Sequence, residues 1–128
     1  MKDRTKLTDA DKKLLAKEAR DLAAERKLLN RKWAKEILLV LEKGDKCCCD
    51  IREGLIQNGK TITEDMANKT LKHLLKFDFI KKIKSPTSHE QKDFTLTPYG
   101  REALVLIHKL MDFGSRYNKR MDIKNAEK

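Results

Sequence analysis

The sequence lacks the long apolar runs that a membrane protein needs. No stretch of its 128 residues approaches the roughly 20 consecutive apolar residues of a membrane-spanning helix. The N-terminus also lacks the apolar segment of a secretory signal peptide. We therefore expect a soluble protein that stays inside the cell and has no membrane partner.

The sequence also lacks the residue patterns of catalytic and metal sites. His73, His89 and His108 lie far apart, without the spacing of metal ligands. There is no glycine-rich phosphate-binding loop, and no nucleophile accompanied by paired acids. We expect neither an enzyme nor a bound cofactor or metal ion.

Acidic residues are outnumbered by basic ones. The 30 Lys and Arg residues exceed the 20 Asp and Glu residues, which gives a formal net charge of +10. Such a surface attracts polyanions, and nucleic acid is the first partner to consider. Arginine is absent between Arg52 and Arg101, so lysine supplies the positive charge in the middle of the chain.

Apolar periodicity and capping residues predict a mostly helical α+β domain with one β-hairpin. The length suits a single core. The expected elements are helices over 8–28 and 31–43, a short helix from about Asp45 to Asn58-Gly59, a helix from Thr63 to about Phe77, strands over 79–84 and 93–97, and a last helix that starts at Thr97-Pro98 and passes Phe113.

These elements divide the chain into four parts. Residues 1–30 form an N-terminal helix, 31–97 a compact core, 98–118 a C-terminal helix and 119–128 a flexible basic tail. The N-terminal helix carries an apolar stripe that must pack against another surface, and the apolar face of the C-terminal helix is wider than one small core covers. We expect them to form a dimer interface that includes Leu15, Leu22, Leu104, Ile107 and Met111.

The order of helices followed by a hairpin is that of a winged helix-turn-helix, in which the second helix of the motif enters the major groove of DNA. Lys69, Lys72 and Lys76 fall within an arc of about 60° on that helix, with Asn68 and His73 beside them. The expected wing and phosphate contacts are Lys81, Lys82, Lys84, His89 and Lys92. The alternative is that these lysines only solvate an outward face.

Several strings resemble the HxlR family of winged-helix transcriptional regulators and, more distantly, the MarR, PadR and ArsR families. They are Lys32-Trp33 with Ile37-Leu38, Leu71-Lys72-His73-Leu74 before Phe79-Ile80, and the run from Leu96 to Leu104. The resemblance implies a dimer on pseudo-palindromic operators, with much of the dimer contact made by the first and last helices. HxlR-like regulators often have a cysteine ahead of the tryptophan helix, and this chain has none there.

The three cysteines are adjacent, so they do not form a disulfide framework. Cys47-Cys48-Cys49-Asp50-Ile51 resembles the Cys-x-Cys-Asp metal box of arsenical-sensing ArsR proteins. A helix start lowers a thiol pKa and suits Cys47 and Cys49 for sensing. We favour the alternative that the cysteines are structural or incidental, which includes buried cysteines and an intersubunit disulfide. A small-molecule or redox effector is possible but not supported by the sequence.

Three functions follow from these patterns. The first is a dimeric, sequence-specific transcriptional regulator that binds double-stranded DNA in the cytoplasm, associated with the nucleoid. The second is an architectural protein that coats DNA with little sequence preference, since arginine is the usual reader of guanine. The third is a protein-interaction module of the transcription machinery.

Overall fold

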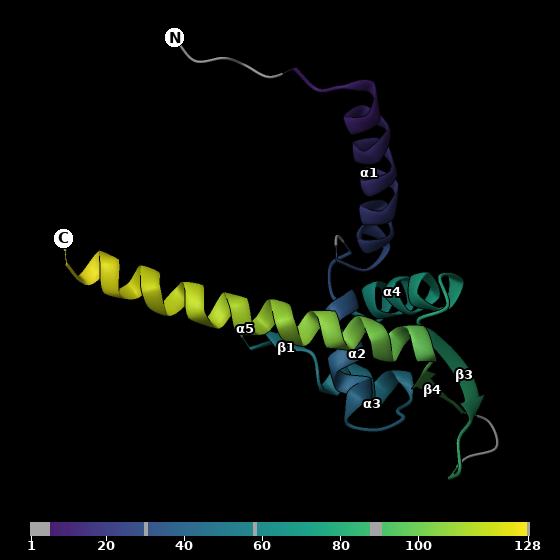
Figure 1. Cartoon of the computed structure of the whole chain (residues 1–128). Helices are drawn as coiled ribbons and strands as arrows, with labels where there is room; N and C mark the ends of the chain where they lie inside the picture. The colour runs from purple at the N-terminus through teal and green to yellow at the C-terminus, as the bar shows by residue number, and fades with distance from the viewer. Residues whose placement is uncertain (1–5, 30, 58, 88–90, 128) are drawn as a thin grey trace.

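The structure is a computed structural model that describes residues 6–29, 31–57, 59–87 and 91–127 (Figure 1). The elements in these ranges are α1 (Asp9–Leu29), α2 (Ala34–Glu42), α3 (Cys48–Glu53), β1 (Ile56–Gln57), β2 (Lys60–Thr61), α4 (Glu64–Lys76), β3 (Ile80–Lys84), β4 (Lys92–Leu96) and α5 (Pro98–Ala126). The chain has the predicted mostly helical α+β class.

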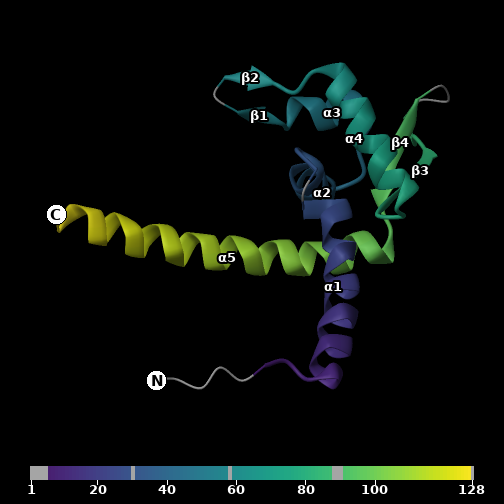
Figure 2. The same ribbon diagram turned by 90° about the horizontal axis from the view of Figure 1, so that it is seen from above.

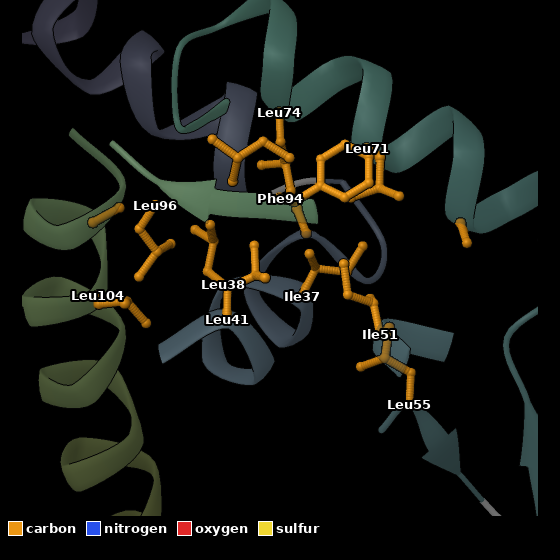
Figure 3. Packing of buried hydrophobic residues seen from close by; sticks show 14 of the residues in the cluster. Ile37, Leu38, Leu41, Ile51, Leu55, Leu71, Leu74, Phe94, Leu96 and Leu104 are labelled. Atoms are coloured by element: carbon orange, nitrogen blue, oxygen red, sulfur yellow. The ribbon is translucent and has the colours of Figure 1, made fainter. Parts of the chain in front are cut away.

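Helix α2 lies at the centre of the hydrophobic core. Its Ile37 and Leu38 are fully buried, and they lie among side chains from α3, α4, β4 and α5 (Figure 3). Burying one such aliphatic side chain stabilises a fold by about 1.5–3 kcal/mol. The core therefore ties the helix pair α3 and α4 to the hairpin and to the start of α5.

Helix α4 begins where the sequence predicts. The hydroxyl of Thr63 accepts a hydrogen bond from the Met66 amide at 3.2 Å, which satisfies one of the free N–H groups of the first turn. Thr70 is buried, and its hydroxyl donates to the Met66 carbonyl at 2.8 Å. Together with Ala67 and Leu74, it forms the inward side of the helix.

Strands β3 and β4 form the predicted antiparallel hairpin, and α5 follows without a loop. The Thr97 hydroxyl accepts from the Gly100 amide at 3.1 Å and donates to the Asp78 carbonyl at the base of the hairpin. A Cβ atom at Gly100 would overlap the carbonyl oxygen of Phe79. Only glycine lets α5 pack this closely against the hairpin.

The segment after α3 differs from the sequence prediction. Helix α3 ends at Glu53, and the short strands β1 and β2 pair as a second antiparallel hairpin. Gly59 has a φ of 76° in the turn between them. The expected helix end at Asn58-Gly59 was wrong: the glycine serves a hairpin turn, where left-handed backbone is equally required. Asn58 itself lies outside the described residues.

Two helix ends also differ from the prediction. Helix α2 starts at Ala34 because Trp33 before it has left-handed backbone, with a φ of 75°. Helix α5 continues to Ala126, so the expected flexible tail over 119–128 was wrong for its helical part. Lysine, arginine, methionine and alanine in this segment are good helix formers, which its low apolar content concealed.

The apolar residues of α1 and α5 divide into two groups. Leu104 and Ile107 are only 4% and 2% exposed, because they belong to the core of this chain, so their prediction as dimer contacts was wrong. Leu15, Leu22 and Met111 are exposed, as are the further α5 residues Val105, Leu106, Leu110, Phe113, Tyr117 and Ile123.

In the described ranges, no helix is long and apolar enough to cross a membrane.

Candidate nucleic-acid interface

Helix α4 turns its polar side chains to solvent. Asn68, Lys69, Lys72 and Lys76 are exposed, whereas Leu71 is buried. At about 100° per residue, positions 69, 72 and 76 share one side of a helix. The structure therefore brings the three predicted lysines together on the outward side of the second helix of an α3–α4 pair.

Two of these lysines make contacts with neighbouring side chains. The ammonium of Lys69 lies 3.1 Å from the carboxylate of Asp65, one turn earlier, and that of Lys76 lies 5.4 Å from the centre of the Phe77 ring. His73 packs edge-on against the same ring, with centroids 4.9 Å apart. Because exposed ion pairs contribute only about 0–1 kcal/mol, Asp65 can readily be exchanged for another hydrogen-bond acceptor as the partner of Lys69.

The predicted wing lysines lie on both faces of the hairpin formed by β3 and β4. Alternation along the strands places Lys82, Lys84 and Lys92 on the face that carries the buried Phe94, and Lys81 on the opposite face. Lys84 lies directly opposite Lys92 in the register, an arrangement of like charges that destabilises a hairpin. A bound anion would relieve that repulsion. His89 lies outside the described residues.

The cysteines lie beside the lysine-bearing helix. Cys47 is buried, Cys49 is exposed, and all three thiols are free. The thiol of Cys48 donates to the side-chain oxygen of Asn68 on α4 at 3.6 Å. The sequence had singled out Cys47 and Cys49, but the thiol in contact with α4 is that of Cys48.

The environment of Cys48 disfavours its thiolate, whereas the expectation of an acidic thiol was made for Cys47 and Cys49. Burial raises the pKa of Cys48 above its ordinary value, and the neighbouring Cys49 adds to the increase, while Arg52 opposes it. Desolvation thus outweighs the opposing positive charge of Arg52. Among the described residues, no cluster of histidine, cysteine and acidic side chains is suited to hold a metal ion.

Three basic residues outside the predicted set also lie beside α4. Arg26 from α1, and Arg31 and Lys32 from the turn after it, line a hollow with Met66, Lys69 and His73. Figure 1 shows α1 descending onto α4. This neighbourhood could not be predicted from the sequence, because more than 30 positions separate the two segments.

A short helix, an exposed lysine-bearing helix packed across it and a following β-hairpin define a winged helix-turn-helix. The model of the HxlR-like helix-turn-helix family matches residues 28–122, and the chain belongs to that family. It is therefore a helix-turn-helix transcriptional regulator, and the family resemblance seen in the sequence is confirmed.

Solved structures share the fold. A MarR-family transcriptional regulator from Enterococcus faecalis V583 is 20% identical, with a TM-score of 0.66 over 92% of this chain and 96% of that one. The reduced form of the transcriptional regulator YodB from B. subtilis is 18% identical, with a TM-score of 0.61 over 88% and 95%. A PadR-family regulator from Clostridium difficile R20291 is 21% identical, with a TM-score of 0.58 over 68% and 96%. No curated protein matches the chain.

Proposed function

We propose that this protein is a dimeric regulator that recognises specific DNA sequences through α4 and acts in the cytoplasm, associated with the nucleoid. The observation that carries the proposal is the exposed lysine side of α4 next to a lysine-bearing hairpin. Figure 2 shows α4 running alongside β3 and β4, so one duplex could contact both. Its role is regulatory and not catalytic.

The contacts divide between bases and backbone. Asn68, Lys69, Lys72 and His73 approach base edges in the major groove, since amide and ammonium groups pair with the acceptors of purines. Lysines hold the phosphates and set the register of the protein on the duplex. The phosphate-binding group is Lys76 with the hairpin residues Lys82, Lys84 and Lys92.

The test is the double variant Lys69→Ala with Lys72→Ala. A matched control, Lys119→Ala with Arg120→Ala, removes the same charge from the exposed far end of α5. Because each base-reading contact is worth about 1–3 kcal/mol, we expect the α4 variant to lose at least about a hundredfold in affinity for a site selected from random DNA. Equal affinity of the two variants would refute the assigned face.

The competing functions give different results in the same assay. An architectural protein bound to a labelled copy of the selected site would be displaced equally well by random DNA and by the unlabelled site. A protein-interaction module would bind DNA only weakly and without a steep dependence on salt. Protection of the selected site against excess random DNA supports sequence-specific regulation.

Dimerisation is proposed from the surface of α5. Leu110 and Met111 are about half exposed, and Phe113 is 61% exposed and stacks on Tyr117 with centroids 6.2 Å apart. A patch of this kind on one helix is typical of an interface. Sedimentation should give a dimer for the wild type and a monomer for Met111→Glu with Phe113→Glu, whereas a monomeric wild type would refute dimerisation.

A further inference from the structure

A basic hollow lies between the end of α1 and the flank of α4. Its volume is about 450 Å³, and it is open to solvent. The lining side chains are those of Arg26, Arg31, Lys32, Met66, Lys69 and His73. All but Met66 carry nitrogen donors that suit an anion.

The hollow adjoins the proposed DNA-reading side of α4. Met66, Lys69 and His73 are three and four positions apart, so they share one flank of the helix. Lys69 also belongs to the outward lysine side, which makes it the link between the two surfaces. Asn68, which accepts from Cys48, lies on the other flank, toward α3.

The charges in the hollow are only partly compensated. Asp65 lies 3.1 Å from the ammonium of Lys69, and the ammonium of Lys32 lies 5.8 Å from the centre of the Trp33 ring. Two arginines contribute planar guanidinium groups, which match the oxygens of a phosphate in pairs. Arg26, Arg31 and Lys32 therefore supply the donors of a phosphate-binding site, at the border of the base-reading residues Lys69 and His73.

We infer that this hollow binds a phosphate group of the DNA backbone that borders the groove occupied by α4. The inference rests on the proposed function, because α4 must approach a duplex for the hollow to meet it. An open, cationic depression at the edge of the reading helix fits a backbone that runs past it. The turn between α1 and α2 thereby becomes part of the DNA-binding surface.

The first experiment compares two charge-matched triple variants over a salt series. One is Arg26→Gln, Arg31→Gln and Lys32→Gln. The other is Lys119→Gln, Arg120→Gln and Lys124→Gln at the far end of α5, which Figures 1 and 2 show projecting away from α4. Each phosphate contact contributes about 0.9 to the slope of log affinity against log salt.

We expect the hollow variant to lower that slope by about 1 per protomer, the contribution of one phosphate contact, with a loss of affinity of at least about tenfold at low salt, while the control keeps the wild-type slope. Equal slopes for the two variants would overturn the inference and leave the proposed function standing. Failure of the wild type to prefer any DNA site would instead overturn the proposed function.

Two further measurements complete the test. The double variant Arg26→Lys with Arg31→Lys retains the positive charge but loses the planar guanidinium groups. It should therefore keep the slope of log affinity against log salt and bind DNA more weakly. This variant also remains informative if the triple variant fails to fold. Titration with inorganic phosphate distinguishes a free anion from DNA. Saturable phosphate binding that the triple variant loses, combined with unchanged DNA binding, would assign the hollow to a free anion and overturn the DNA assignment.

Discussion

Two glycines in α5 allow the packing of that helix against the hairpin to be tested directly. A Cβ atom at Gly100 would overlap the Phe79 carbonyl oxygen and lie 3.2 Å from a methyl carbon of Leu96. At Gly114, an added Cβ atom meets nothing within 4 Å. The same substitution to alanine therefore probes a crowded position and an open one in a single helix.

The expected effects have opposite signs. Overpacking costs about 1–3 kcal/mol, and the upper value applies at Gly100 because backbone atoms cannot move aside. Alanine in place of glycine stabilises a helix by up to about 1 kcal/mol. Gly100→Ala should thus lower the free energy of unfolding by about 2 kcal/mol, and Gly114→Ala should raise it by up to about 1 kcal/mol.

Urea denaturation followed by circular dichroism measures both variants. The protein concentration must be the same in each series, because dimerisation makes apparent stability depend on concentration. If the two variants are equally stable, then α5 does not pack against the base of the hairpin at Gly100 as described, and the close-approach argument fails.

Three further predictions concern the cap of α5, the buried and exposed residues of that helix, and the reactivity of the cysteines. Thr97→Ala removes the cap of α5 and should lower the free energy of unfolding by about 1–2 kcal/mol, with Thr97→Ser restoring most of it in the same assay. Leu104→Ala should cost about 2–5 kcal/mol, whereas the half-exposed Met111 should tolerate alanine within about 0.5 kcal/mol and show its effect in the dissociation constant of the proposed dimer; equal unfolding costs would contradict the burial pattern. Because burial raises the pKa of Cys48, iodoacetamide should alkylate Cys49 first at pH 7, and the rate at Cys48 should climb in alkaline solution; mass spectrometry that finds both modified equally fast at pH 7 would refute this order.

Elements that local chemistry determines could be predicted from the sequence. Thr63 and Thr97 each cap a helix start through their own hydroxyl, so the start signal lies within four residues. The hairpin strands were predicted from short-range alternation, and the observed pairing of Ile80 with Leu96 agrees with it. In such segments the tertiary structure adds little to the local preference.

Elements that depend on distant contacts could not be predicted in this way. Apolar residues occupy about half of the circumference of α5, and nothing local distinguishes Leu104, which faces the core, from Leu106, which is exposed. The strands β1 and β2 have two residues each, too few for alternation to reveal them. Trp33 has left-handed backbone, an uncommon conformation for a bulky residue that no sequence rule would assign.

In the candidate site too, some residues could be predicted from local spacing and others could not. The lysines of α4 could be found because one helix carries them at helical spacing. Arg26 and Arg31 could not, since only the tertiary structure brings the end of α1 and the turn after it to the flank of α4. The contact of Cys48 with Asn68 likewise depends on how α3 lies on α4, and the cysteine string alone pointed to its neighbours.

The absence of a loop between β4 and α5 has a mechanical consequence. Helix α5 has 29 residues and, at a rise of about 1.5 Å per residue, spans about 44 Å. Thr97 and Gly100 hold its first turn against the base of the hairpin, so the orientation of the helix and that of the hairpin are coupled. A ligand or partner that tilted the distal end of α5 would therefore also reorient strands β3 and β4, which carry the proposed phosphate contacts Lys82, Lys84 and Lys92.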